Sequence, residues 1–240
     1  MKQHSLSKST VLHLLPGALG TVVYVLLAPA LLDKGYPALF ALLIAVGVVT
    51  LPFQVGYLFL QRRNADDDQP VLGLRESLPM WQYFVFPLIM VIWGFLASGA
   101  LSLFDVALAK NWFSWLPDWF FVFDAEQFNV FSREALMTTF WIGLIVNGFA
   151  GPIVEEYYFR SHLLPRLSGP RNWAPFINIS LFSLYHFWTP WQFFSRILWL
   201  LPWGYIAWRK KNFYLMMIAH CTANTIGWLL TWAAIFGQQI

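Results

Sequence analysis

Seven apolar segments of membrane-spanning length constrain the fold of this sequence more than any other feature. A helix needs about 20 apolar residues to cross the hydrocarbon core of a bilayer. At that length, the 240 residues of the chain hold about six to eight spans joined by short loops. Charged residues or clusters of Pro and Gly separate the segments, which fall at about residues 12–32, 36–60, 81–104, 135–159, 173–187, 193–208 and 213–236.

The composition excludes a soluble globular enzyme. Charged residues make up 11% of the chain and hydrophobic residues 58%, whereas an ordinary soluble domain has about 25% charged residues. Fifteen basic and 12 acidic residues cannot cover the surface of such a chain in water, but lipid requires no such covering. The predicted fold class is therefore all-α. We expect a polytopic membrane protein that forms one integral membrane domain over residues 1–240, with about seven transmembrane helices and eight as the alternative.

The basic residues lie in twos and threes between the apolar segments, so the net charge of +3 indicates membrane topology and not binding of nucleic acid. Placing the amino terminus in the cytosol obeys the positive-inside rule, because most basic residues then lie in the cytosol. Short loops favour a bacterial plasma membrane, and an endoplasmic-reticulum membrane satisfies the same rule. The residues predicted to be cytosolic are Lys2, Lys8, Arg62, Arg63, Arg75, Arg166, Arg171, Arg209, Lys210 and Lys211.

The segment from Asp105 to Arg133 differs from the spans, because clusters of aromatic residues alternate with acidic residues. We expect this segment to lie at the membrane interface on the outer side, with a short helix along the surface. An eighth span within it would invert the orientation of all later helices, and the basic loops at residues 166–171 and 209–211 argue against that.

Ionisable side chains inside the predicted spans are costly in lipid and usually mark a functional site. At the helical rise of 1.5 Å per residue, Glu155, His186 and His220 each lie roughly 14 to 21 Å from the nearest cytosolic loop. One carboxyl group and two imidazole groups on three predicted helices thus lie at a similar depth in the membrane. A common polar cavity requires this arrangement. The full set within the spans is Glu155, Glu156, Arg160, His186, Arg196 and His220, with Asn147, Asn178 and Asn224 as uncharged polar companions.

The spacing of these residues indicates separate roles. Glu156 and Arg160 are four residues apart and can form an ion pair along the helix. Glu155 points about 100° away from Glu156, has no partner in its helix and is suited to accept a proton. A carboxylate, a histidine that shares a water with it, and a second histidine with an amide are the components of a hydrolase that attacks with water. Asn178, Phe182 and His186 also fall at four-residue steps on one helix, and His220 and Asn224 are four residues apart on another.

Other interpretations of the same residues stay open at this point. Asn and His side chains also form packing contacts between membrane helices, and a transporter coupled to protons uses Glu and His within the membrane. Arg196 lies near the outer end of its span and is expected to be structural. The remaining histidines, His4, His13 and His162, are expected to be solvated or interfacial.

The ordered motifs Glu155-Glu156-x-x-x-Arg160, Phe182-x-x-x-His186 and His220-x-x-x-Asn224 resemble those of the CPBP family. This family comprises the CAAX-processing and bacteriocin-processing intramembrane proteases and is also called the Abi family. The resemblance covers a protease core at about residues 135–235, and residues 72–75 in the second cytosolic loop also resemble the family.

The resemblance implies an intramembrane endopeptidase with a cavity that opens toward the cytosol. Glu155 would activate a water that His186 helps to hold, Glu156 and Arg160 would order the motif helix, and His220 and Asn224 would form the oxyanion site. The expected partners are the lipid bilayer and a peptide or protein substrate, with a lipid-modified substrate as one option. A non-proteolytic interaction or immunity protein on the same scaffold is the alternative function.

A metal-free mechanism is favoured, and no cofactor is expected. The alternative is a divalent metal such as zinc, because Glu155, His186 and His220 could supply three ligands and leave one position open for water. Against zinc, the HExxH signature of common zinc proteases is missing from the sequence.

Overall fold

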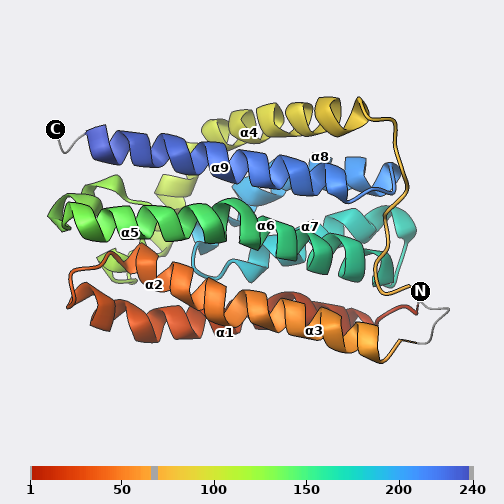
Figure 1. Cartoon of the computed structure of the whole chain (residues 1–240), viewed down its shortest axis with the longest axis horizontal. Helices are drawn as coiled ribbons and strands as arrows, with labels where there is room; N and C mark the ends of the chain where they lie inside the picture. The colour runs from red at the N-terminus through yellow and green to blue at the C-terminus, as the bar shows by residue number, and fades with distance from the viewer. Residues whose placement is uncertain (1, 66–69, 238–240) are drawn as a thin grey trace.

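The computed structural model describes residues 2–65 and 70–237, and in these residues the protein is an all-α bundle. Figure 1 shows most of the helices lying along one common axis. The described residues contain no strand, and their only β-type pairings are isolated bridges between His4 and Leu167 and between Arg75 and Asn212. The predicted fold class, an all-α polytopic membrane protein, is confirmed.

Four helical segments of the described chain are long and apolar enough to cross a membrane. They correspond to the first four apolar segments of the sequence. Two of them are single helices, α1 (Leu6–Leu32) and α4 (Gln82–Trp112). The other two are composite, with π-helical stretches between α-helices: α2 (Ala38–Ala45), η1 (Val46–Thr50) and α3 (Leu51–Arg63) form one, and α5 (Arg133–Gly143), η4 (Leu144–Ala150), α6 (Gly151–Glu155), η5 (Glu156–Leu163) and η6 (Leu164–Arg166) form the other.

The last three predicted segments are also helical, but α7 is shorter than a span. Helix α7 (Ala174–Tyr185) has 12 residues and rises about 18 Å, against about 30 Å for the hydrocarbon core. The hydroxyl of Tyr205 donates to the carbonyl oxygen of Asn172 at 2.8 Å, so the start of α7 and the end of α8 (Phe193–Arg209) lie together. Helices α7 and α8 thus form a hairpin whose turn lies inside the bundle. Helix α9 (Tyr214–Gly237) follows it.

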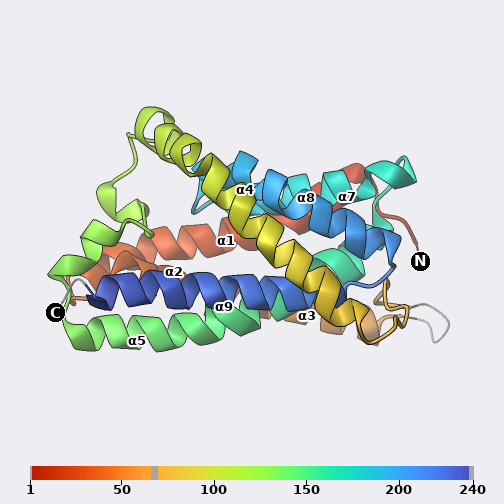
Figure 2. The ribbon, with the colours of Figure 1, turned by 90° about the horizontal axis from the view of Figure 1, so that it is seen from above.

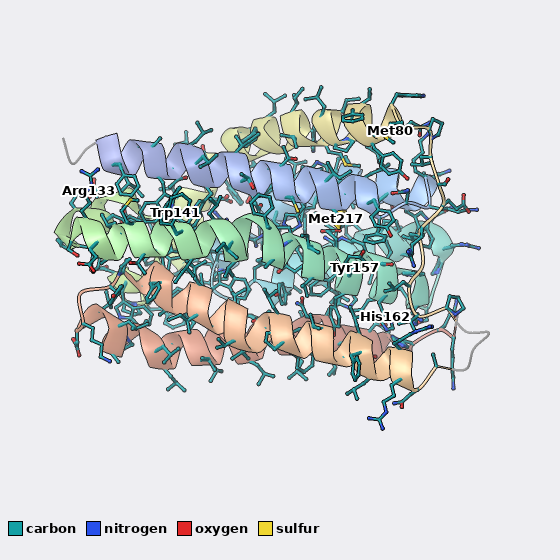
Figure 3. The ribbon with its side chains drawn as sticks, viewed as in Figure 1. Met80, Arg133, Trp141, Tyr157, His162 and Met217 are labelled. Atoms are coloured by element: carbon teal, nitrogen blue, oxygen red, sulfur yellow. The ribbon has the colours of Figure 1, made fainter. Side chains whose placement is uncertain are left out.

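The loops at the ends of α3, η6 and α8 meet at one end of the bundle, which we call the basic end. The amide of His4 donates to the carbonyl oxygen of Arg166, and Arg166 donates to the carbonyl oxygen of Pro70, at 2.8 and 2.9 Å. Lys211 forms an ion pair with Glu76 at 2.9 Å. Helix α1 starts at this end and α9 finishes at the opposite end, and Figure 3 places His162 near the former and Arg133 near the latter.

The segment after α4 begins later than predicted, because α4 continues to Trp112 and includes Asp105. Two short 3₁₀ helices follow, η2 (Asp118–Phe120) and η3 (Ala125–Val130). Phe120 in η2 and Phe128 in η3 are buried, and between the two helices the ring centroid of Phe121 lies 4.8 Å from that of Trp191. This part of the described chain contains no eighth span. Helix α4 itself crosses α8 and α9 at an angle, as Figure 2 shows.

Helix α1 packs directly against the end of α7 that carries a predicted site residue. A β-carbon at Gly17 would overlap the carbonyl oxygen of Tyr185, so only glycine allows this approach. The hydroxyl of Tyr158 donates to the carbonyl oxygen of Leu12 at 2.8 Å and joins the motif helix to α1. The first span, which carries no motif of its own, therefore contacts both α7 and the helical segment that carries Glu155.

Candidate active site

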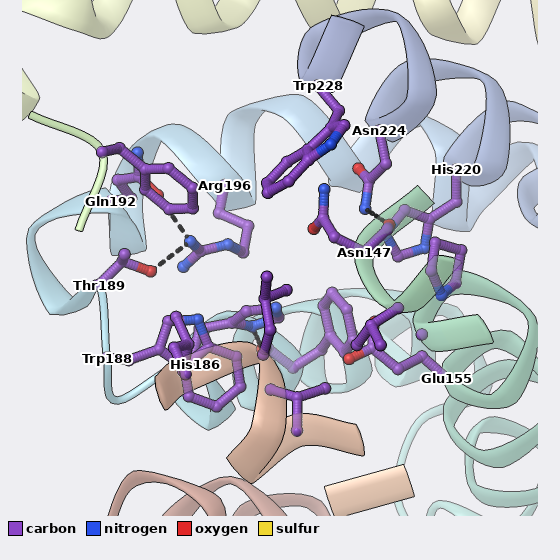
Figure 4. A pocket seen from close by; sticks show the side chains of 18 of the residues that line it. Asn147, Glu155, His186, Trp188, Thr189, Gln192, Arg196, His220, Asn224 and Trp228 are labelled. Carbon is purple, nitrogen blue, oxygen red and sulfur yellow. Dashed lines mark hydrogen bonds between the residues drawn. The ribbon is translucent and has the colours of Figure 1, made fainter. Parts of the chain in front are cut away.

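The centre of the bundle contains a cavity of about 200 Å³ between the helices that carry the sequence motifs. We call it the central cavity, and Figure 4 shows the side chains around it. Four of the six predicted site residues line it, namely Glu155, His186, His220 and Asn224. Glu156 and Arg160 are fully buried behind it. The structure thus brings together residues from three separate segments of the chain around one cavity.

Glu155 lies in the central cavity and has a hydrogen-bond partner that the sequence did not suggest. The hydroxyl of Tyr185 donates to Oε1 of Glu155 at 3.0 Å, and Nε2 of Gln54 donates to the Tyr185 hydroxyl at 3.2 Å. No cation among the described residues lies within 4.0 Å of the Glu155 carboxylate. Glu155 is therefore a buried carboxylate that one neutral donor orients. Tyrosine at a helix end is typical of the interfacial belt, which is why sequence reasoning missed Tyr185.

Glu156 forms the predicted ion pair and a second contact. Its Oε2 lies 3.5 Å from Nε of Arg160, and its Oε1 lies 3.0 Å from Nδ1 of His220. The guanidinium of Arg160 also lies over the ring of Phe182, 4.1 Å from its centroid. This buried cluster joins the motif helix to α7 and α9 and fixes where His220 points.

His186 lies just beyond the last residue of α7. There its ring, in place of a backbone N–H group, contacts the carbonyl oxygen of Phe182 in the last turn of the helix. Its Nδ1 lies 2.8 Å from the carbonyl oxygen of Phe182. A carbonyl oxygen only accepts, so we assign the proton to Nδ1, which leaves Nε2 of the neutral ring as an acceptor. No direct hydrogen bond joins His186 to Glu155 in the described chain, although both line the central cavity.

Asn224 reaches the cavity through a break in the helix opposite. Pro152 lacks an N–H group, and one residue earlier the Gly151 N–H donates to the carbonyl oxygen of Val146 in a π-helical turn. That turn leaves the carbonyl oxygen of Asn147 free, and Nδ2 of Asn224 donates to it at 2.9 Å. An asparagine amide has two N–H donors, so one remains for another acceptor.

The expectation that His4, His13 and His162 are solvated or interfacial is wrong, because all three are buried. Asn178 does not line the cavity with His186; its Nδ2 lies 2.9 Å from Nε2 of His13. His13 and His162 are fully buried, and Nδ1 of His162 lies 2.8 Å from the carbonyl oxygen of Val71. His4 is also buried, and burial, together with nearby cations, lowers the pKa of its imidazole to about 4. The reason is the packing of α1 and of the loop at residues 70–75 against the bundle. These contacts cover the histidines, although their places near the ends of the predicted spans suggested contact with water.

Arg196 differs from its expectation as well. It does not reach the interface; it is buried, with 9% of its surface exposed, and lines the central cavity. Its guanidinium donates to Thr189 Oγ1 and Gln192 Oε1, both at 2.9 Å, as Figure 4 shows. The apolar segment at residues 193–208 predicted a complete span, with Arg196 near its outer end. Because α7 and α8 form a hairpin, that position falls inside the bundle.

The cavity extends away from the basic end. On the side of the basic end, Phe159, Arg160 and Met216 are completely buried, and none of them lines the cavity. On the other side its lining includes Leu39, at the start of α2, and Phe123, after α4. A second cavity shares both of these residues and continues between α4 and α9. The described residues therefore do not place the opening at the amino-terminal end of the bundle, where the sequence analysis expected it.

The described residues include no group of three or more His, Cys, Asp or Glu side chains placed to hold a metal ion. The three candidate ligands, Glu155, His186 and His220, all line the cavity but do not form such a group. In addition, Nδ1 of His220 is directed to Glu156. The arrangement of these side chains does not fit the three-ligand zinc site considered from the sequence.

The central cavity, among apolar helices, brings together a buried glutamate, two histidines and an asparagine, which are the groups that a hydrolase acting with water needs. The family model for type II CAAX prenyl endopeptidase Rce1-like proteins matches residues 137–226, which include all six predicted site residues. The chain thus carries an Rce1-like domain, and its resemblance to the CPBP family of intramembrane proteases is confirmed. No curated protein and no solved structure matches the chain.

Proposed function

We propose that this protein is an intramembrane endopeptidase in which Glu155 activates the attacking water. The observation that carries the proposal is the position of Glu155, a buried carboxylate in the central cavity with one neutral donor and no cation within 4.0 Å in the described chain. Such a carboxylate has a free oxygen that can accept a proton from water. Membership of a protease family supports a peptide as the substrate.

The other site residues divide the remaining tasks. His186 offers an acceptor nitrogen to the same water, since its Nδ1 is held by Phe182. His220 and the second N–H of Asn224 provide donors for the oxyanion that forms when water adds to the carbonyl. This role of His220 requires a protonated ring, in which Nδ1 donates to Glu156 and Nε2 donates to the oxyanion. Glu156 and Arg160 position His220 and do not contact the substrate.

Comparing the peptides that accumulate in cells carrying the wild type or Glu155→Ala tests the proposal and identifies the substrate. We expect cleavage products that are present with the wild type and absent with the variant. A biological effect of the protein that persists unchanged in Glu155→Ala would support the non-proteolytic interaction protein instead. Flux of a solute into sealed vesicles that depends on Glu155, without a peptide product, would support a transporter.

We propose a mechanism without a metal, since the described side chains do not fit a three-ligand site. Purified protein is expected to contain well below one equivalent of zinc and to keep its peptidase activity after dialysis against a chelator. The measurements are metal content by mass spectrometry and activity before and after chelation. One equivalent of zinc, with activity lost on chelation and restored by zinc, would overturn this proposal.

For the orientation, we propose that the basic end faces the cytosol, because the basic loops gather there. The central cavity then lies toward the outer half of the membrane. A peptide substrate would reach it from that side or from the lipid between α4 and α9. A prenylated cytosolic tail, the substrate class that the name of the family suggests, would need either entry from the lipid or the opposite orientation.

Cysteine labelling distinguishes the two orientations. Cys221 is the only cysteine in the chain, so Cys221→Ala provides a background for single cysteines at the exposed positions Asn129 and Asn172. On intact cells, a membrane-impermeant maleimide is expected to label Asn129→Cys and not Asn172→Cys. Both should react after the membrane is opened, which controls for accessibility. The reverse pattern on intact cells would place the basic end outside.

A further inference from the structure

Arg196 is a buried cation in the central cavity for which the proposed mechanism has no use. It lies in the first turn of α8 and shares the cavity with Glu155 and His186. Figure 4 shows its guanidinium beside Thr189 and Gln192, to which it donates the two hydrogen bonds drawn. A charged group this deep in a membrane protein is costly unless it serves a structure or a ligand.

The partners of Arg196 in the described chain are neutral. Nη2 donates to Thr189 Oγ1 and to Gln192 Oε1, both at 2.9 Å, and Nη1 approaches the carbonyl oxygen of Ser183 at 3.4 Å. Asp105 and Glu155 are close enough for their charges to act on it, but neither carboxylate lies within 4.0 Å. The positive charge is therefore held in place but not neutralised by an ion pair.

The chemistry of the guanidinium group limits which ligands could neutralise the charge of Arg196. The group has five N–H donors and carries a permanent positive charge, so an anion such as a carboxylate is its preferred ligand. Both hydrogens of Nη2 and one of Nη1 are used within the chain, so the Nε hydrogen and one Nη1 hydrogen remain for single hydrogen bonds to a ligand in the cavity. Thr189 and Gln192 fix the guanidinium before the ligand arrives, which reduces the entropy lost on binding.

We propose that Arg196 binds a carboxylate of the peptide substrate and thereby selects which peptide bond reaches Glu155. The inference rests on the proposed peptidase function and adds a substrate class to it. The carboxylate belongs either to a free carboxyl terminus or to an acidic side chain, since both offer the same two oxygens. At about 3.3 to 3.6 Å per extended residue, a carboxylate within about two or three residues of the cleaved bond fits the small cavity.

Arg196 also holds the turn that follows His186, so its replacement lowers activity even if its role is only structural. A loss of cleavage alone is therefore no test. The informative quantity is the ratio between two matched peptides that differ only in the carboxylate. A structural role lowers binding of both peptides equally, whereas direct recognition removes the difference between them.

The experiment measures peptide binding to the full chain in phospholipid nanodiscs, in the Glu155→Gln background so that no peptide is cleaved. The probes are a short apolar peptide with a free carboxyl terminus, the same peptide as its amide, and an amidated pair with Asp or Asn near its end. We expect the peptide with the recognised carboxylate to bind about tenfold to a hundredfold more tightly than its neutral partner. The terminal pair and the side-chain pair identify which source of carboxylate is used.

In the double variant with Arg196→Gln this ratio is expected to fall to about one, and Arg196→Lys should keep part of it, since lysine retains the charge but not the planar guanidinium that Thr189 and Gln192 hold. Equal binding of acid and neutral peptides in both pairs, or a preference that survives Arg196→Gln, would overturn the inference. Because the readout is binding, it holds even if the wild type proves to cleave no peptide. That separate result, from the cleavage comparison, would overturn the proposed function.

Discussion

Replacing Glu155 by glutamine is expected to lower peptide cleavage by about a hundredfold to ten-thousandfold, the range for loss of a general base. Glutamine has nearly the same shape and keeps an oxygen that can accept the hydrogen bond from Tyr185. It cannot take a proton from water, so the substitution removes the chemistry and leaves the packing. The measurement is the initial rate of cleavage of a peptide identified from cells, with purified protein in phospholipid nanodiscs.

Two controls make this result specific. Glu76→Gln removes another carboxylate, whose side chain is 59% exposed at the basic end, and is expected to leave cleavage unchanged. Tyr185→Phe removes only the hydroxyl that orients Glu155 and should reduce cleavage by less than Glu155→Gln. Thermal unfolding of Glu155→Gln is expected to match the wild type. Cleavage at the wild-type rate in Glu155→Gln would mean that another group activates the water.

The helices were predictable because lipid imposes a length and a polarity on each span. The first four apolar segments correspond to the four long helical segments of the structure. The end of α4 was not predictable in this way, since Asp105 lies within the helix, beside Ser195 and Arg196, and does not terminate it. Helix α7 ends at Tyr185 although aromatic residues continue beyond it, and it ends there because the chain turns into the hairpin with α8.

The placement of the candidate site followed from spacing along single helices. Glu156 and Arg160 form the expected contact one turn apart, and Glu155 points elsewhere, as a helix requires. Contacts between distant helices could not be predicted in the same way. Gln54 and Tyr185 are 131 residues apart in sequence, and His13 and Asn178 are 165 apart. Their positions depend on how α1, α3 and α7 pack, which no local pattern encodes.

Glu156→Gln is expected to cause the largest loss of stability among the site variants. The Glu156 carboxylate is fully buried and is the only acid within 4.0 Å of the equally buried Arg160 in the described chain. Removing one partner of a buried ion pair leaves the other charge uncompensated, which costs about 3 to 5 kcal/mol. The contact with His220 is weakened as well, because an amide holds a protonated imidazole less strongly than a carboxylate does. Thermal unfolding of purified protein in detergent measures the loss.

The double variant Glu156→Gln/Arg160→Met separates the uncompensated charge from the loss of the contact. Methionine fills much of the space of arginine and leaves no buried cation, and replacing both members of a buried pair by uncharged groups is often neutral or stabilising. We therefore expect the double variant to be more stable than Glu156→Gln alone but still impaired in cleavage, because His220 loses the carboxylate that positions it. Equal unfolding temperatures of wild type and Glu156→Gln would contradict this account. In that case the ion pair would order the motif helix without stabilising the bundle.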